Sequence, residues 1–372
     1  MRKITKIISI ILTISLVLLG CSSKDKKQES TTSSDGKSYK IGIVTGEGGA
    51  KDKSFNQANV EAIEGWAKDN GSKTPVVIET KNQSDLAANL QNAAKASDIV
   101  SLAGYEFEGE ITKIADQYKN VKFLYIDSFA DAPNIASLVF KEQEAGYLAG
   151  YAAALHSKTG KVGFIGGTKI PPVERFGIGF VQGAKAAKED IKIMYNYSGT
   201  FSDTNKGKTL AATMYDAGAD VIFVAAGATG NGAISEAKER GILDMSKSGE
   251  IKHWIVGVDK DQYEEGLFKG KDKDGKEVEK SIILTSAVKR IDVAVTKILN
   301  EIKMDKFVKG QHDFGMKEDG VGLPENNPNL SEDIKSKIAA VVADVKDGKV
   351  TVVATGDELK SKGNVTNIEG EI

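Results

Sequence analysis

Cysteine and histidine are both scarce in this chain of 372 residues, which contains one cysteine and three histidines. A single cysteine cannot form a disulfide within the chain or build a thiolate metal site. The three histidines, His156, His253 and His312, stand in unrelated sequence contexts, and none is spaced from a cysteine or an acid as metal ligands usually are. We therefore expect no metal site and no cofactor.

The sequence also lacks the short motifs of common enzymes and any surplus of positive charge. It contains no G-x-S-x-G, H-E-x-x-H or G-x-x-x-x-G-K-[ST] pattern. Its 50 Lys and Arg residues are balanced by 52 Asp and Glu residues, a net charge of -2. A nucleic-acid-binding protein usually carries a basic surplus. We therefore expect a binding protein that is not an enzyme and has no nucleic-acid partner.

The N-terminus has the pattern of an export signal. A basic start, "MRKITK", is followed by the apolar run "IISIILTISLVLLG", and Cys21 comes directly after it. This arrangement resembles the lipobox of bacterial lipoproteins, in which the cysteine is lipidated and becomes the mature N-terminus. We predict a lipoprotein signal peptide over residues 1–20, which is removed so that Cys21 can be lipidated. The alternative is an ordinary signal peptide, with a cysteine that follows it by chance and carries no lipid.

The next segment, residues 21–38, is polar. Residues 22–38 include no large apolar side chain. Such a composition cannot bury a core, so we expect a lipidated, flexible tether. The expected location is the extracytoplasmic face of a bacterial cell membrane, where the lipid anchor would hold a monomer.

From residue 39 onward, short apolar runs alternate with longer amphipathic stretches. The apolar runs are nearly continuous, which is typical of parallel strands that are buried on both faces. Stretches such as 56–71 and 228–241 have the helical period and end at glycine. The pattern predicts an α/β fold with doubly wound sheets. The expected strands are "YKIGIV", "TPVVIET", "DIVSLA", "KFLYID", "ASLVF", "KVGFIGG", "IKIMYNYS", "DVIFVAAG", "HWIVGVD" and "SIILTSAV".

The alternation begins a second time near residue 161, which predicts two similar lobes with a cleft between them. In such sheets, ligands bind beyond the carboxyl ends of the strands. Asp127 and Asp259 each follow a predicted strand, although turn or helix-cap chemistry would also place an aspartate there. The predicted N-terminal lobe comprises residues 39–137 and 260–288, and the predicted C-terminal lobe comprises 138–259 and 289–372, the position of 320–372 being left open.

Other residues at strand ends suggest how a ligand is held. Phe55 and Phe201 lie in polar loops after strands of different lobes, so a planar ligand could stack between them; the alternative is that each ring caps its own lobe's core. Lys289 ends a strand, and Gly227 lies in the glycine-rich "AAGATGNG" at a predicted helix start. The backbone N–H groups of such a start can bind polar ligand atoms.

Six motifs occur in the order "DKSFNQ", "RFGIGFVQGAKAA", "YSGTFSD", "GADVIFVAAGATGNG", "VGVDKDQ" and "TSAVKR". Together they resemble the basic-membrane-protein family of lipoproteins, which includes purine nucleoside receptors of ABC importers. The resemblance extends from residue 39 over the rest of the chain. It implies the type I periplasmic-binding-protein fold, in which two lobes joined by three crossovers close on a ligand. It also implies ABC permease and ATPase subunits as partners.

The resemblance also implies roles for particular residues. The base is stacked between Phe55 and Phe201, and the ribose is held by Asp259, Lys289 and Gly227. A contact with the base is implied for Asp127, and Asn56 and Asp52 belong to the motif that contains Phe55. Tyr105, in "AGYEF", is a further candidate for facing the base.

The identity of the ligand stays open in the sequence. Family members usually carry "VTD" where this chain has "VTG", so Gly46 replaces an aspartate that helps to read the base, and Glu47 could reach the vacated place. One alternative is the same fold binding a simple sugar or a signalling small molecule. Another is a surface antigen or adhesin lipoprotein.

The anchor prediction is tested by Cys21→Ser. The variant should fold normally but should no longer fractionate with membranes, because it lacks the thiol to which lipid is attached. Membrane fractionation and detergent partitioning measure this. A variant that stays with the lipid would show that Cys21 is not the anchor.

Overall fold

The computed structural model describes residues 37–363 and 366–372. The predicted signal peptide and Cys21 lie outside these residues, as does the predicted tether except for its last two positions. Within the described ranges, no helix is both long enough and apolar enough to cross a membrane.

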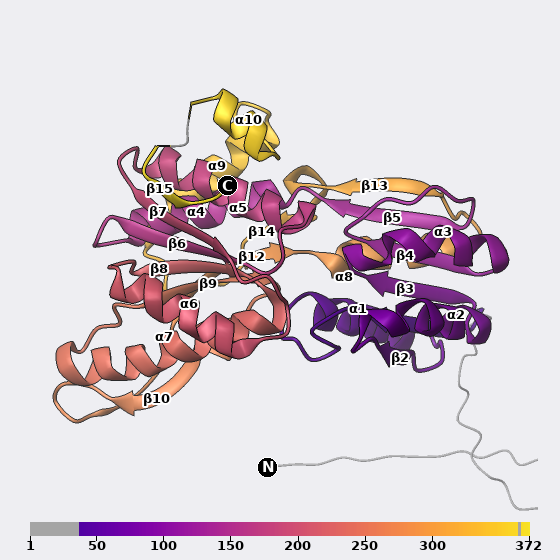
Figure 1. The fold of residues 1–372 in the computed structure, drawn as a ribbon, viewed down its shortest axis with the longest axis horizontal. Helices are drawn as coiled ribbons and strands as arrows, with labels where there is room; N and C mark the ends of the chain where they lie inside the picture. The colour runs from indigo at the N-terminus through magenta and orange to yellow at the C-terminus, as the bar shows by residue number, and fades with distance from the viewer. Residues whose placement is uncertain (1–36, 364–365) are drawn as a thin grey trace, which may run out of the picture. The chain divides into compact units, whose positions relative to one another are not determined.

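The first lobe is built on a six-stranded, wholly parallel sheet (Figure 1). Helices α1 and α8 pack on one face of this sheet, and helices α2 and α3 pack on the other. In sheet order the strands are β13 (Gly310–Phe314), β5 (Ile135–Phe140), β4 (Lys122–Ile126), β3 (Ile99–Ala103), β1 (Ile41–Thr45) and β2 (Val76–Glu79). The helices are α1 (Phe55–Asp69), α2 (Leu86–Ala96), α3 (Glu108–Gln117) and α8 (Ile291–Lys303).

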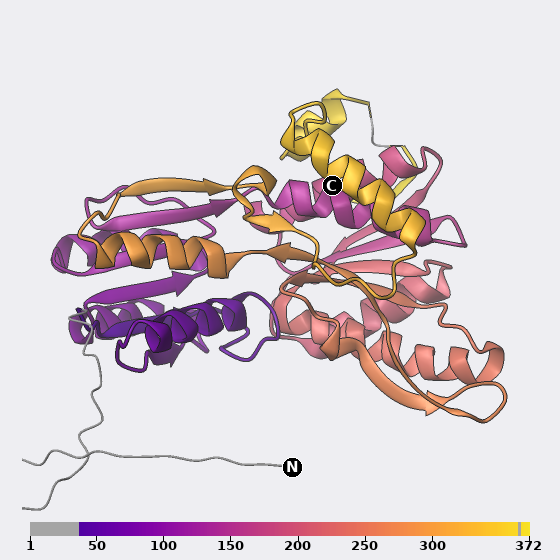
Figure 2. The same ribbon diagram turned by 180° about the vertical axis from the view of Figure 1, so that it is seen from behind.

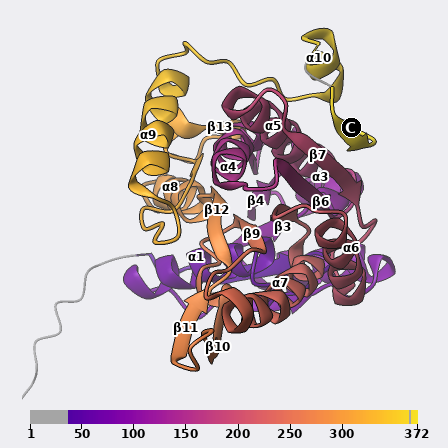
Figure 3. The same ribbon diagram turned by 90° about the vertical axis from the view of Figure 1, so that its left-hand side faces the viewer.

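The second lobe is built on a seven-stranded sheet that is parallel except for the short strand β14. Helices α4 and α5 cover one face, and α6 and α7 cover the other (Figure 3). In sheet order the strands are β14 (Val321–Gly322), β12 (Ile283–Lys289), β9 (Trp254–Asp259), β8 (Val221–Ala225), β6 (Lys161–Gly166), β7 (Lys192–Tyr197) and β15 (Ile368–Gly370). The helices are α4 (Glu142–His156), α5 (Pro171–Ala187), α6 (Thr204–Asp216) and α7 (Gly227–Ser248).

The remaining elements lie on the outside of the second lobe. Helix α9 (Glu332–Lys346) contacts α4, and helix α10 (Gly356–Ser361) contacts α5. Strands β10 (Leu267–Lys271) and β11 (Glu277–Ser281) form an antiparallel hairpin. The C-terminal segments therefore belong to the second lobe, which settles the position that the sequence left open.

Both sheets repeat one strand order, because β2-β1-β3-β4-β5 in the first lobe matches β7-β6-β8-β9-β12 in the second. The buried strands are the continuous apolar runs of the sequence, and β1, β3 and β8 are buried along their whole length. The prediction of an α/β fold with two doubly wound lobes is confirmed. The first and third strands of each lobe flank the point where the strand order reverses, and ligands bind at this point in doubly wound folds.

The predicted lobe boundaries are wrong for two segments. Strand β12 pairs with β9 in the second sheet, so residues 260–288 belong to the second lobe and not to the first. Strand β13 pairs with β5, and α8 packs against α1, so residues 291–314 belong to the first lobe (Figure 2). For β12 the reason is that an apolar run fits either sheet, and only long-range pairing decides which sheet it joins. Strand β13 has the sequence GQHDF, which is mostly polar, and it is not among the strands expected from the sequence. The chain thus crosses between the lobes after β5, after β12 and after β13.

A second correction concerns the helix expected to end at Gly241, because α7 continues to Ser248. Gly241 is a packing position: a Cβ there would lie 2.8 Å from the Cγ2 atom of Ile282. The helix ends before Gly249, which has φ of 78°, a left-handed conformation that favours glycine.

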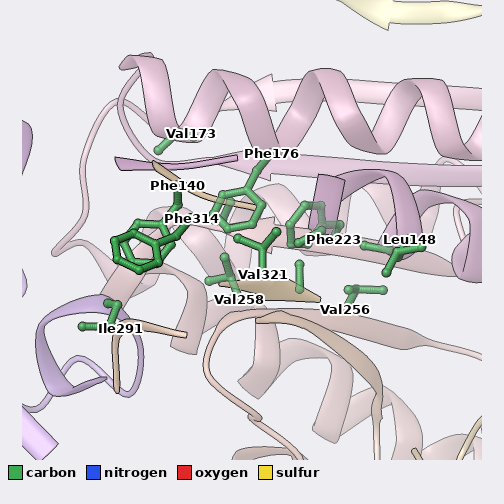
Figure 4. Close-up of a cluster of buried hydrophobic side chains, with 14 of the residues drawn as sticks. Phe140, Leu148, Val173, Phe176, Phe223, Val256, Val258, Ile291, Phe314 and Val321 are labelled. Carbon is green, nitrogen blue, oxygen red and sulfur yellow. The ribbon is translucent and has the colours of Figure 1, made fainter. Parts of the chain in front are cut away.

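One buried apolar cluster spans both lobes (Figure 4). Phe140 and Phe314 come from neighbouring strands of the first lobe, and their rings stack with centroids 5.4 Å apart. Phe176 on α5 and Phe223 on β8 continue the cluster into the second lobe, with their rings edge to face at 5.8 Å. Burying each such ring contributes on the order of 1.5–3 kcal/mol. The lobes therefore share a core beneath their strand ends.

Helices α4 and α5 cross in close contact because glycines face each other at the crossing (Figure 3). Gly146 and Gly150 lie on α4, and Gly179 and Gly183 lie on α5. At each of these positions an added Cβ would lie 1.8–2.2 Å from a backbone carbonyl oxygen of the other helix. No side chain fits at that distance, so the crossing fixes where the N-terminal ends of both helices lie.

Gly183→Ala should therefore lower the free energy of unfolding by about 1–3 kcal/mol, because the backbones must separate to admit the methyl group. The matched control is Gly65→Ala in the middle of α1, where an added Cβ meets nothing within 4 Å. That change should raise stability by about 0.5–1 kcal/mol through helix propensity. Urea unfolding of both variants measures this. A fully stable Gly183→Ala protein would contradict the close crossing.

Candidate functional site

A cavity lies at the carboxyl ends of the strands, lined by residues of both lobes, with an empty volume of about 600 Å³ that is partly open to solvent. The sequence-predicted site residues all line it: Asp52, Phe55, Asn56, Tyr105, Asp127, Phe201, Gly227, Asp259 and Lys289. Tertiary structure thus gathers residues from loops that are far apart in the sequence.

The side chain of Lys289 is the charged centre of this cavity. It is buried at the end of β12, and its Nζ atom lies 2.5 Å from Asp127 Oδ2, 3.1 Å from Glu142 Oε1 and 3.8 Å from Asp259 Oδ1. Glu142 begins α4 and also pairs with Arg175 on α5, with 2.5 Å between Oε2 and Nε. These five side chains form the Lys289 group, which contains three carboxylates (Asp127, Glu142 and Asp259) and two cations (Lys289 and Arg175). One negative charge is left over when all of its members are ionised.

Burial and pairing act in opposite directions on the pKa values of this group. Burial raises the pKa of Asp127 to about 7, although Lys289 lowers it. Burial likewise raises the pKa of Asp259 above its usual value. For Glu142, the attraction of Lys289 and Arg175 outweighs burial and lowers the pKa. For Lys289, burial alone would lower the pKa, but the three carboxylates together raise it. The lysine is therefore charged at every physiological pH.

The backbone at both aspartates is in the left-handed region. Asp127 follows β4 with φ of 74°, and Asp259 ends β9 with φ of 64°. Such conformations cost about 1–3 kcal/mol in a residue other than glycine and cluster at functional sites. Among the described residues, Asp127 Oδ1 is buried and has no hydrogen-bond partner. This oxygen can accept a hydrogen bond from a bound molecule.

Phe55 and Phe201 line the cavity from opposite lobes. Phe55 begins α1, and its ring centroid lies 4.8 Å from Lys289 Nζ. Phe201 lies in the loop between β7 and α6, where its ring packs against Gly167. A Cβ at Gly167 would lie 2.2 Å from the ring, so glycine is required there. Gly227, with φ of 53°, begins α7 beside Phe201.

Asp52 and Asn56 line the cavity, but their polar atoms bind their own loop. The Asp52 carboxylate accepts hydrogen bonds from the backbone N–H groups of Ser54, Asn56 and Gln57, and so caps α1. The Asn56 amide accepts from Gly46 N at 3.0 Å and donates to Asp52 Oδ2 at 3.0 Å. These two residues therefore position the loop that carries Phe55.

The loops around the cavity are joined across the two lobes. Glu47 of the first lobe accepts hydrogen bonds from Thr200 Oγ1 and Ser202 Oγ of the second, both at 2.6 Å. Ser54 Oγ donates to Asp259 Oδ2 at 2.5 Å. The side chains of Asn231 and Gln262 donate to backbone carbonyls of the loop before α1. These contacts correspond to a closed cleft.

Sequence reasoning missed Glu142, Arg175, Phe176 and Glu106, all of which belong to or line this site. An acid at a helix start is ordinarily explained by the helix dipole, so Glu142 gave no signal. The "RFG" of the quoted motif contains Arg175 and Phe176, and it could have pointed to them. In the part of the chain that the structure describes, no group of three or more His, Cys, Asp or Glu residues is placed to hold a metal ion.

Lys289→Met should destabilise the protein, and more so at pH 8 than at pH 5. Removing one partner of a buried ion pair typically costs about 3–5 kcal/mol. The pKa of Asp127 is about 7 and that of Asp259 is raised, compared with about 3.9 in an unfolded chain. Between roughly pH 4 and 7 the folded state therefore binds more protons, and stability falls as pH rises. Without Lys289 these pKa values rise further.

Urea unfolding of wild type and variant at the two pH values measures this effect. Lys306→Met removes an exposed lysine and should change little at either pH. An equal loss at pH 5 and pH 8 in Lys289→Met would show that the lysine does not neutralise the buried carboxylates.

The chain was compared with known proteins. The model of the family described as "ABC transporter substrate-binding protein PnrA-like" matches residues 40–350. A protein named "ABC transporter nucleoside-binding protein BmpA", from Lactococcus lactis, is 37% identical over 358 residues, which is 94% of this chain and 99% of that protein. A protein named "CD4+ T-cell-stimulating antigen", from Listeria innocua, is 34% identical over 358 residues, with coverage of 94% and 98%.

Among solved structures, a solute-binding protein of an ABC transporter system from Aeropyrum pernix has the same fold. The TM-score is 0.73 with 23% identity, and the match covers 88% of this chain and 98% of that one. This confirms the type I periplasmic-binding-protein fold, and the family match confirms the resemblance found in the motifs. The chain belongs to the family of PnrA-like substrate-binding proteins of ABC transporters.

Proposed function

We propose that this protein binds a purine nucleoside in the cavity between its lobes and delivers it to an ABC permease. The observation that carries the proposal is the juxtaposition of the buried Lys289 group with two phenylalanine rings. One end of the cavity suits hydroxyl groups, and the middle suits a flat ring. A nucleoside has both parts, joined by one bond.

The ribose would lie against Lys289, Asp127 and Asp259. Asp127 Oδ1 is a buried acceptor without a partner among the described residues, and a ligand hydroxyl would supply the missing donor. Hydrogen bonds to ionised groups are roughly twice as strong as neutral ones. The N-terminus of α7 at Gly227 adds backbone N–H groups that can donate to the ligand. A deoxyribose lacks one hydroxyl and would leave one of these buried charged groups without its hydrogen-bond partner. The binding free energy should then weaken by an amount on the order of 1–3 kcal/mol.

The base would stack between Phe55 of the first lobe and Phe201 of the second. Stacking of a base on an aromatic ring contributes roughly 1–3 kcal/mol. Because the rings come from different lobes, both contact one base only when the cleft is closed. The ligand would thus stabilise the closed state by its differential affinity for it. The bonds of Glu47 to Thr200 and Ser202 would add to that stabilisation.

Delivery to a permease follows from membership of an ABC substrate-binding family. The printed name of the Lactococcus lactis relative supports a nucleoside as the ligand. We place the protein on the extracytoplasmic face of the membrane, held there through lipidated Cys21. Asp52 and Asn56 would contribute by positioning Phe55, and Tyr105 would form part of the cavity wall.

The proposal is tested by titrating the protein with inosine, guanosine, adenosine, uridine, free hypoxanthine, ribose and glucose. Purine nucleosides should raise the thermal midpoint, because a ligand that binds the folded state stabilises it. Free base and free sugar should bind weakly, since each fills one part of the cavity. Phe201→Ala should weaken nucleoside binding by about 1–3 kcal/mol. Calorimetry measures the affinities.

The matched control is Phe129→Ala, which removes a ring that is 48% exposed and does not line the cavity. It should bind nucleosides as the wild type does. If glucose or ribose bound more tightly than every nucleoside, the protein would be a sugar receptor. If no compound bound, the antigen or adhesin alternative would replace the proposal.

A further inference from the structure

A carboxylate that the proposed ribose and ring contacts do not use lies in the cavity wall. Glu106 belongs to the short 3-10 helix Tyr105–Phe107, between β3 and α3. A Cβ at Gly46 would lie 1.7 Å from its Oε1 atom, and a Cβ at Gly104 would lie 2.2 Å from its Oε2 atom. The carboxylate therefore occupies space that any side chain at these two positions would need. Two glycines from different loops make room for it.

The charge of Glu106 is poorly compensated. Its Oε1 atom accepts a hydrogen bond from the backbone N–H of Glu47 at 3.2 Å. Within residues 37–363 and 366–372, no side chain donates to this carboxylate, and no cation lies within salt-bridge distance. Burial raises its pKa above the usual value. A half-buried carboxylate without a cation retains acceptor capacity, and a donor on a ligand can use it.

Glu106 lies at the end of the cavity away from Lys289. Glu106 also lines a second cavity, which adjoins the first and is bordered by residues 80–84. Of these two cavities, Lys289, Asp127 and Asp259 line only the first. Other polar groups at this end already have partners. Glu47 accepts from Thr200 and Ser202, and Ser202 and Thr200 are thereby engaged as well.

We propose that Glu106 is a specificity-determining residue that accepts a hydrogen bond from the N1–H group of a 6-oxopurine nucleoside and so favours inosine and guanosine over adenosine. This inference rests on the proposed nucleoside function and names the substrate class for that site.

The geometry of a purine nucleoside carries the argument. The ribose is attached at N9, and the N1 edge lies on the opposite side of the ring system. With the ribose at Lys289 and the base between the two phenylalanine rings, the N1 edge meets the end of the cavity where Glu106 lies. Hypoxanthine and guanine have an N–H donor at N1, whereas adenine has a lone pair there that a carboxylate repels. A site built around such a hydrogen bond discriminates strongly against ligands that lack the donor.

The first experiment leaves the protein unchanged and alters the ligand. Calorimetry on the full chain in detergent compares inosine with adenosine and with 1-methylinosine, in which a methyl group replaces the N1 hydrogen. Inosine should bind at least about tenfold more tightly than either of the others, because only inosine donates to an ionised acceptor.

The second experiment uses Glu106→Gln. An amide accepts more weakly than a carboxylate, and it can turn to donate to the N1 of adenine. Inosine affinity should therefore fall about tenfold, while adenosine affinity should stay unchanged or rise. The thermal midpoint of the ligand-free variant should not be lower than that of the wild type, because a half-buried charge without a cation has been removed and the amide oxygen can still accept from Glu47 N. Glu110→Gln makes the same chemical change outside the cavity and should alter neither affinity.

The outcomes separate this inference from the function on which it rests. A reversal or loss of the inosine preference in Glu106→Gln, with stability retained, supports the assignment. Equal binding of inosine and adenosine by the wild type, or an equal fall for both in the variant, overturns the role of Glu106 and leaves nucleoside binding intact. If the wild type binds no nucleoside, the proposed function fails, and this inference fails with it.

Discussion

The buried ammonium group of Lys289 is the interaction on which the arrangement of this cleft depends. A charge removed from water must be paired, and Lys289 is paired from both lobes. Asp127, after β4, belongs to the first lobe. Glu142, at the start of α4, and Asp259, at the end of β9, belong to the second. Rings of Phe55, Phe140 and Phe176 surround the same atom at 4.8–5.5 Å. One cation therefore fixes strand ends, helix ends and aromatic side chains relative to one another.

The glycines near the site have a related physical role, because they determine where backbone and side chains can approach. The crossing of α4 and α5 depends on glycines that face carbonyl oxygens, and it sets the position of the helix ends that carry Glu142 and Arg175. Gly167 admits the ring of Phe201, and Gly46 and Gly104 admit the carboxylate of Glu106. The absence of a Cβ atom thus shapes the cavity as much as the side chains that line it.

Fold and proposed function are connected through the crossovers. Each lobe carries its loops at the carboxyl ends of parallel strands, and the chain passes between the lobes three times near this edge. In the proposed function, ligand contacts from both lobes would couple binding to closure, since a molecule held by Phe55 and Phe201 together would bridge the cleft. The direct bonds of Glu47 and Ser54 to the opposite lobe provide part of the same closed geometry.

The sequence by itself determined the ten apolar strands, the two-lobe α/β class and six of the nine predicted cavity residues, and the family resemblance supplied the other three: Asp52, Asn56 and Tyr105. It could do so because buried parallel strands are continuous apolar runs, and because polar or aromatic residues directly after them meet at one edge of the sheet. Only the tertiary structure decided that β12 joins the second sheet, since an apolar strand can pair with either edge. It also revealed β13 in the first sheet, because the mostly polar GQHDF gives no apolar run to predict a strand from. Only the tertiary structure also revealed Glu142 and Glu106, because their surroundings come from elements far away in the sequence: Lys289 faces the first, and Gly46 and Glu47 face the second.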